Sequence, residues 1–301
     1  MSNIHAIILS KDRAAQLHLC LQSLVKNDNG IFSKISILYR SSNEDFENGY
    51  RVVKEEFPSI NWVSEFKYYD DVMKLTQVPT KNIAFLTDDD IIYKKIPVNS
   101  IIIDDYMNST QFDINSPLCF SLRLGLNTYI QDQYTGQHVV PPEPLYDNGP
   151  IIAWDWTKVP SYTNFGYPFS VDGHIFNRKV MEKMLSELRF NNPNQQEVAM
   201  STKSGEYASP AVDKKWMLAF KDSVLINTPL NRVQEVCLNR SGERFGISPE
   251  ELNSKFLEGQ TLSLDDIDFS NIIGCHQELS MTWKQRKSRW AKTQILAPIT
   301  K

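Results

Sequence analysis

The chain has 301 residues, of which 41% are hydrophobic and 23% are charged, so it can bury a sizeable core as one large or two small domains. Its formal net charge of −4 argues against general nucleic-acid binding, which needs a broad cationic surface. The four cysteines form no CxxC pair, which favours a reducing cytosol. With neither a cationic leader nor an apolar run of ~20 residues, we expect a cytoplasmic protein without a membrane-spanning helix.

The N-terminal third alternates between predicted strands and helices. Residues 4–9 are a continuous apolar run, typical of a parallel strand buried on both faces. The same patterns predict further strands at 36–39, 61–63 and 82–87, and helices at 14–25, 46–56 and 71–75. This alternation predicts an α/β fold with a mainly parallel sheet, whose ligands collect at the carboxyl ends of the strands.

The rest of the chain is less regular. We expect helices at 99–108, 178–188 and 212–220 and strands at 118–122, 170–176 and 223–227, with a long ordered loop at 131–163. In that loop Trp154 and Trp156 either stack on an acceptor sugar or pack the loop onto the domain. Without repeats or a low-complexity linker, the sequence predicts one catalytic domain over 1–230 and a C-terminal extension over 231–301 that packs on it.

Three consecutive aspartates, Asp88, Asp89 and Asp90, end the strand predicted at 82–87. In a strand alternate residues share a face, so we expect Asp88 and Asp90 to point the same way and to repel each other. A divalent cation relieves this repulsion, and Mg²⁺ or Mn²⁺ also holds phosphate oxygens. The pattern favours a metal-diphosphate site, with a solvated acidic turn as the alternative.

Basic and polar residues follow several of the predicted strands. Because the ends of parallel strands meet at one edge, they are candidates for binding phosphate, base or sugar, with surface ion pairing as the alternative. The donor-binding candidates are Ser10, Lys11, Arg13, Arg40, Asp88 and Asp89. Arg123, after the strand at 118–122, is a candidate acceptor contact.

Separated patches of residues 4–200 resemble GT-A glycosyltransferases of the family-2 type. Ile7-Ile8-Leu9-Ser10-Lys11-Asp12-Arg13 and the following helix look like their opening strand, polar turn and helix. Phe85-Leu86-Thr87-Asp88-Asp89-Asp90 looks like their Asp-x-Asp motif. The resemblance implies a Rossmann-like, mixed but mainly parallel sheet with helices on both faces, a nucleotide-sugar donor, and Mn²⁺ or Mg²⁺ at Asp88 and Asp90.

A third patch implies the catalytic base. Gly173-His174-Ile175-Phe176-Asn177-Arg178, a helix and then Glu197 resemble the segment that leads to the catalytic acid of inverting members. Glu197, or alternatively Asp172, would accept the proton of the acceptor hydroxyl. His174 is a candidate acceptor contact. The match departs from the family at Val198, where an Asp usually follows the catalytic acid.

Two further features complete the resemblance. His276, followed by Trp283, is similar to the late His that reaches back as a metal ligand in several GT-A families. In contrast, Tyr39-Arg40-Ser41-Ser42 has no acid where the family usually binds the nucleoside after its second strand.

The C-terminal segment interleaves tryptophans with cations, namely Trp283, Lys284, Arg286, Lys287, Arg289, Trp290 and Lys292. This pattern fits an interfacial helix on anionic lipid, and equally a helix that packs its tryptophans on the domain. Either the extension closes the site or it gives peripheral contact with the inner face of a membrane.

We therefore predict a metal-dependent glycosyltransferase that moves a sugar from a nucleotide-sugar donor to a carbohydrate hydroxyl of a glycan or lipid-linked glycan. Family habit suggests bacterial surface-polysaccharide synthesis. One alternative is a sugar nucleotidyltransferase, although Ser10–Ala15 lacks the glycines of a phosphate loop. The other is a carbohydrate-binding module with Ca²⁺, which leaves the strand-helix alternation and Glu197 without a role.

Overall fold

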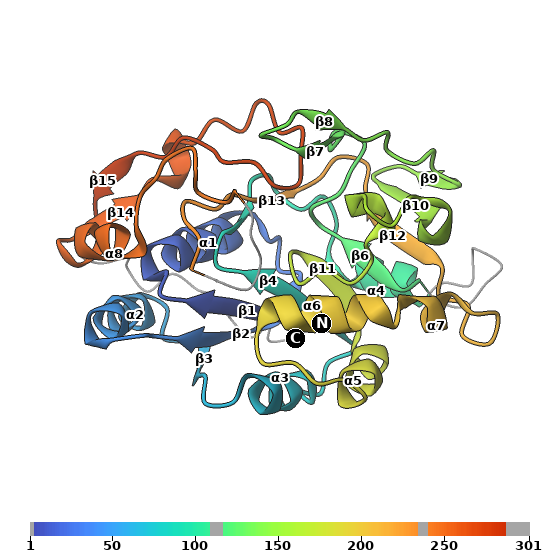
Figure 1. Cartoon of the computed structure of the whole chain (residues 1–301), viewed down its shortest axis with the longest axis horizontal. Helices are drawn as coiled ribbons and strands as arrows, with labels where there is room; N and C mark the ends of the chain where they lie inside the picture. The colour runs from blue at the N-terminus through green and yellow to red at the C-terminus, as the bar shows by residue number, and fades with distance from the viewer. Residues whose placement is uncertain (1–2, 109–116, 234–239, 287–301) are drawn as a thin grey trace, which may run out of the picture.

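The computed structural model describes residues 3–108, 117–233 and 240–286. A nine-stranded sheet runs through them in the order β3-β2-β1-β4-β11-β6-β12-β10-β9 (Figure 1). Its strands are β1 (Ile4–Lys11), β2 (Phe32–Arg40), β3 (Asn61–Ser64), β4 (Asn82–Thr87), β6 (Cys119–Ser121), β9 (Tyr146–Asn148), β10 (Ile151–Asp155), β11 (His174–Asn177) and β12 (Trp216–Phe220). Strands β1 to β4 are parallel, whereas β11 runs antiparallel between β4 and β6. The predicted class, a mixed and mainly parallel α/β sheet, is confirmed.

Three small antiparallel pairs flank this sheet. They are β5 (Asp90–Ile92) with β13 (Leu225–Asn227), β7 (Ile130–Asp132) with β8 (Gln137–His138), and β14 (Gln260–Leu262) with β15 (Trp283–Gln285). β5 follows β4 after Asp88 and Asp89, so its pairing with β13 brings Leu225–Asn227 close to the carboxyl end of β4.

Helices cover both faces of the main sheet. They are α1 (Ala14–Asn27), α2 (Glu44–Glu56), α3 (Tyr68–Thr76), α4 (Ser100–Met107), α5 (Arg178–Ser186), α6 (Pro193–Thr202), α7 (Ser204–Ala208) and α8 (Pro249–Leu257), with 3₁₀ turns at Trp156–Lys158, Asn164–Gly166 and Leu264–Asp266. Along β1, Ile4, Ala6 and Ile8 pack in one core cluster and Ile7 and Leu9 in another. This alternation is the two-face burial expected of a central parallel strand.

The C-terminal extension packs on the side of α1 and α2 (Figure 1). A third apolar cluster joins Leu19 of α1 and Ile226 of β13 to Leu252, Leu262 and Leu279 of the extension. The predicted boundary at residue 230 stays a prediction. None of the helices in the described ranges has both the length and the apolar character required to cross a bilayer.

Three sequence predictions about elements were wrong. Residues 216–220 form strand β12 rather than a helix, because the apolar run Trp216–Phe220 is buried in the sheet, where periodicity cannot separate a buried strand from a helix. The loop predicted at 131–163 contains β8, β9 and β10. Trp283–Gln285 pairs with β14 instead of starting a tail helix; Lys287, Arg289, Trp290 and Lys292 lie outside the described residues.

Candidate active site

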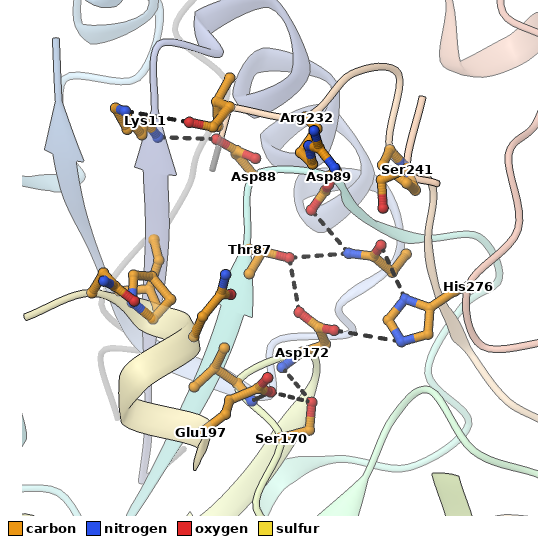
Figure 2. Close-up of a pocket in the computed structure, with 18 of the residues that line it drawn as sticks. Lys11, Thr87, Asp88, Asp89, Ser170, Asp172, Glu197, Arg232, Ser241 and His276 are labelled. Carbon is orange, nitrogen blue, oxygen red and sulfur yellow. Dashed lines mark hydrogen bonds and ion pairs between the residues drawn. The ribbon is translucent and has the colours of Figure 1, made fainter. Parts of the chain in front are cut away.

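A cleft of about 940 Å³ opens at the carboxyl ends of β1, β2 and β4. The residues predicted from sequence that line it are Ser10, Lys11, Arg13, Arg40, Asp88, Asp89, Arg123, Asp172, Glu197 and His276. Figure 2 shows Lys11, Asp88 and Asp89 on one side and Ser170, Asp172 and Glu197 on the other. The structure therefore brings the predicted donor and catalytic residues into one cavity.

The aspartate motif is a turn and not the end of a strand. β4 ends at Thr87 and β5 begins at Asp90, so Asp88 and Asp89 form the connection. Asp90 is 1% exposed and does not line the cleft. Its carboxylate accepts from Thr87 N at 2.9 Å and from Asn227 Nδ2 at 3.1 Å. The expectation that Asp88 and Asp90 share a face is wrong, because the chain leaves the strand between them.

Other acidic side chains also surround Asp90. Burial, Asp172 and Asp89 raise the pKa of Asp90 well above its ordinary value. A carboxyl group in this position favours its neutral form, since desolvation and like charges both disfavour ionisation.

Asp88 and Asp89 share one guanidinium. Arg13 Nη1 lies 3.1 Å from Asp88 Oδ1 and 2.9 Å from Asp89 Oδ2. The other oxygen of Asp88 accepts from Ser10 Oγ at 2.8 Å and from Lys11 N at 3.3 Å. Burial raises the pKa of Asp88 to about 7 although Arg13 opposes the rise. Arg13 is thus a close cationic partner of two of the three neighbouring carboxyl groups.

The turn after β1 places Arg13 beside these carboxylates. Asp12 adopts a left-handed conformation with φ of 56°. Its N–H donates to Arg40 O at 3.1 Å, and its carboxylate accepts from the Ser42 N–H at 2.7 Å and from the Ser42 hydroxyl at 2.6 Å. Asp12 therefore ties the end of β1 to the end of β2, and Arg13 follows at the start of α1.

Sequence reasoning missed several cleft residues, among them Glu65 and Tyr68. Glu65 follows β3 directly, and Arg40 Nη1 lies 3.5 Å from its Oε1. Tyr68, at the start of α3, donates to Gln196 Oε1 at 2.7 Å. The signal for Glu65 is its place after a short strand that ends at the same edge as β1 and β2.

Glu197 lies in α6, which starts at Pro193 because Asn192 caps it by accepting from Gln195 N. Oε1 of Glu197 accepts from Ser170 Oγ at 2.9 Å and from Val171 N at 2.7 Å. Among the described residues, no hydrogen bond to Oε2 is formed. Burial and Asp172 raise the pKa of Glu197 to about 7. This carboxyl group can therefore exchange a proton near neutral pH.

Asp172 and His276 meet at Arg123. Arg123 is 2% exposed, and its Nη1 lies 3.1 Å from Asp172 Oδ2 and 2.7 Å from His276 Nε2. Asp172 also accepts from Thr87 Oγ1 at 3.1 Å. His276 is held beside β13 because Asn227 N donates to Cys275 O and Gln277 N donates to Asn227 O, both at 3.0 Å. The C-terminal extension thus contributes a side chain to the cleft, whereas its role as a metal ligand stays a prediction.

Three predicted acceptor contacts are buried away from the cleft. Trp154 is 1% exposed and donates to Phe165 O, and Trp156 is 7% exposed and donates to Lys214 O. His174 is fully buried, and burial and Arg123 lower its pKa to about 3. The prediction that these residues contact an acceptor is wrong: the tryptophans pack the loop onto the domain, and His174 lies inside the sheet.

The carboxylates at the cleft can supply some of the ligands of a cation, but they do not form a complete coordination shell. Within the described ranges, no group of three or more His, Cys, Asp or Glu side chains gathers to hold a metal ion. Asp88 and Asp89 supply hard oxygen donors, and Mg²⁺ is commonly held by one or two carboxylates together with substrate phosphates. The residues present therefore fit a cation that is bound jointly with a phosphate group.

A curated protein shares sequence with this chain. It is the bifunctional glycosyltransferase pgtA of Dictyostelium discoideum, which is 25% identical over 298 residues that cover 89% of this chain. The chain is related to a glycosyltransferase. It spans 35% of the length of that relative, so the match concerns a part of the larger protein. No protein-family model matches the chain.

Solved structures give weaker comparisons. The S. aureus protein TarS in complex with UDP has a TM-score of 0.43 and 12% identity, over 75% of this chain and 59% of TarS. A cytidylyltransferase from Leptospira borgpetersenii has a TM-score of 0.36 and 13% identity, over 68% of this chain and 74% of that protein. At such scores neither structure decides between a transferase of sugars and one of nucleotides.

Proposed function

We propose that the chain is a glycosyltransferase that moves a sugar from a nucleotide diphosphate donor to a carbohydrate hydroxyl. The observation that carries the proposal is a cleft with cationic side chains and the Asp88–Asp89 turn on one side and a carboxyl group whose pKa is raised to about 7 on the other. Lys11, Arg13, Asp88 and Asp89 form the first side, and Glu197 stands on the second. The sequence similarity to a glycosyltransferase supports the same reaction class.

The diphosphate of the donor would lie at the turn after β4. Lys11, the last residue of β1, and Arg13, which precedes α1, supply positive charge, and the cation-binding oxygens would come from Asp88 and Asp89. When bound there, Mn²⁺ or Mg²⁺ supplies Lewis-acid stabilisation of the negative charge that develops on the leaving diphosphate. Compared with the sequence prediction, Asp89 replaces Asp90, because Asp90 is turned into the protein.

Glu197 is the proposed base. Its Oε1 is fixed by Ser170 and the Val171 N–H, which leaves Oε2 to accept the proton of an acceptor hydroxyl. With its pKa near 7, the group is partly ionised at neutral pH and can still hold the proton after transfer. Asp172 is already paired with Arg123, so we assign it to holding sugar hydroxyls in place of proton transfer.

The acceptor would enter from the side of the cleft that is opposite β1. Gln131, Gln133, Tyr167 and Arg240 also line the cleft and offer hydrogen-bonding groups suited to a glycan. A lipid-linked glycan, contact with the inner face of a membrane, a cytoplasmic setting and bacterial surface-polysaccharide synthesis remain part of the proposal.

A nucleotidyltransferase fits the site less well. That reaction needs no base for an acceptor hydroxyl of a sugar ring, so Glu197 at pKa about 7 would have no task. The turn after β1 is also built around Asp12 and not around glycines that would let a backbone approach phosphate closely.

The test is turnover of nucleotide sugars by the full chain. We expect release of nucleoside diphosphate from at least one member of a panel of UDP-, GDP- and dTDP-sugars, stimulated by a glycan acceptor and abolished by chelation of divalent cations. Release of pyrophosphate from a nucleoside triphosphate and a sugar phosphate, without release from any nucleotide sugar, would establish the nucleotidyltransferase instead.

A further inference from the structure

The ends of three neighbouring strands carry Lys11, Arg40 and Glu65 at one level of the sheet. In the β1–β2 pair Lys11 is opposite Arg40, and in the β2–β3 pair Tyr39 is opposite Ser64. The Glu65 N–H donates to Tyr39 O at 2.8 Å, which continues the ladder by one step. Because adjacent strands lie about 4.8 Å apart, the row spans roughly 10 Å from Lys11 to Glu65.

Given the proposed function, this row determines how the nucleotide-sugar donor is oriented in the cleft. The diphosphate belongs at Lys11 and the Asp88–Asp89 turn, and the sugar must point toward Glu197 for transfer. The nucleoside then extends the other way, over β2 and toward β3. Leu9 and Leu38 line the cleft along this path and offer apolar surface. The base consequently reaches the Arg40–Glu65 pair.

The Arg40–Glu65 pair retains bonding capacity for a ligand. Its contact is loose, with 3.5 Å between Arg40 Nη1 and Glu65 Oε1. The Arg40 side chain is 60% exposed, whereas that of Glu65 is 16% exposed and lies at the wall of the cleft. The pair presents two carboxylate acceptors beside a guanidinium donor.

We propose that Glu65 and Arg40 select guanine, so that the donor is a guanosine diphosphate sugar. Guanine presents two neighbouring N–H donors with a carbonyl oxygen next to them. A carboxylate accepts from two parallel donors in a bidentate pair, and the carbonyl suits a guanidinium. Uracil has one N–H between two carbonyl oxygens, so it meets one carboxylate oxygen and repels the other. Adenine and cytosine place a ring-nitrogen lone pair against the carboxylate.

The space beyond the pair fits the larger base. A second hollow of about 490 Å³ shares Arg40, Glu65 and Tyr68 with the main cleft. It is further lined by Phe66, whose side chain is exposed, and by Arg189, whose guanidinium lies 5.3 Å from the ring centre of Tyr69. A purine bound to the pair can therefore extend into this hollow and contact flat aromatic and guanidinium groups, which stack favourably on bases.

The test is calorimetric titration of the full chain with GDP, UDP, CDP and ADP in the presence of Mg²⁺. We expect GDP to bind at least about tenfold more tightly than UDP, as one bidentate contact to a base discriminates by this order. Glu65→Gln should remove most of this difference, because an amide offers one acceptor and directs its NH₂ at guanine's donors. Arg40→Met, at an exposed side chain, should weaken GDP binding without unfolding the chain, as checked by thermal melting.

The outcomes separate this inference from the proposed function. UDP binding as tight as GDP binding overturns the guanine assignment and leaves the glycosyltransferase standing. A preference for GDP that survives both substitutions overturns the role of Glu65 and Arg40. If none of the four diphosphates binds, the guanine assignment is overturned, and the proposed function fails as well when the nucleotide-sugar panel, dTDP-sugars included, releases no nucleoside diphosphate.

Discussion

The two sides of the cleft are built in different ways. On the β1 side, Lys11, Arg40 and Asp88 each come within a residue of the end of a parallel strand. On the opposite side, Asp172 precedes the antiparallel strand β11 and Glu197 comes from a helix. The residues of the first side are therefore placed by strand ends and strand register, whereas those of the second come from a loop and a helix that strand register does not align.

On the side of Asp172 and Glu197, one long-range contact joins Arg123 and His276, which are 153 residues apart. Glu278 adds another, since its carboxylate accepts from Gly242 N at 2.7 Å and Arg244 N at 3.0 Å, while its own N–H donates to Gln133 Oε1 at 2.7 Å. The extension therefore supports both sides of the cleft, the β1 side, or donor wall, and the opposite side, or acceptor wall. On the donor wall Arg13 Nε donates to Asn231 Oδ1 at 2.9 Å and Lys11 Nζ donates to Val233 O at 3.3 Å.

The donor wall can be broken at the aspartate turn. Asp89→Asn should weaken cation-supported binding of a nucleoside diphosphate about 10- to 100-fold, because it removes a charged ligand from the cleft. Asp90→Asn is the matched control: its side chain is buried, and its pKa is already raised toward the neutral form. Titration with Mn²⁺ followed by electron paramagnetic resonance measures both. A larger loss in Asp90→Asn would make Asp90 the ligand and refute the revised assignment.

The acceptor wall can be loosened at Glu278. Glu278→Gln replaces a carboxylate that accepts from two backbone N–H groups by an amide with one acceptor oxygen, which should raise the KM for the acceptor about three- to tenfold. Donor affinity and the slow hydrolysis of donor without acceptor should not change. Equal weakening of donor binding would show that the two walls are not independent.

The pH dependence of transfer tests the Glu197 side of the cleft, and it involves the smallest expected effect. A base acts when ionised, so kcat/KM should rise with pH through about 7, the raised pKa of Glu197, and level off above it. Burial and then the negative charge of Asp172 raise this pKa. Asp172→Asn should therefore shift the midpoint to lower pH. A profile without an acidic limb near 7, or an upward shift in the variant, contradicts the role of Glu197.

Much of the donor wall could be predicted from the sequence. The apolar run at 4–9 and the residues after it indicate a buried strand followed by a polar turn, and the same holds for the strand before Asp88. The error at Asp90 arose because a strand end cannot be located to one residue: the chain turns at Asp88, and alternation no longer applies.

The acceptor wall could not be predicted in the same way. The sequence shows tryptophans at 154 and 156 but not which of their faces is covered. In the folded chain their indole N–H groups donate to the backbone carbonyls of Phe165 and Lys214. Arg123, Glu197 and His276 were found through strand position or resemblance, but their partners depend on tertiary packing. Glu278 carried no local signal at all.

The most direct test of the account is transfer by Glu197→Gln, measured together with donor affinity. The substitution keeps the shape of the side chain and its contact with Ser170 and Val171 while removing the base. We predict that nucleoside diphosphate binding is unchanged and that kcat for transfer falls by about 10²- to 10⁴-fold. A variant that transfers sugar at the rate of the unaltered chain would contradict the assignment of Glu197 as the base and with it the proposed division of the cleft.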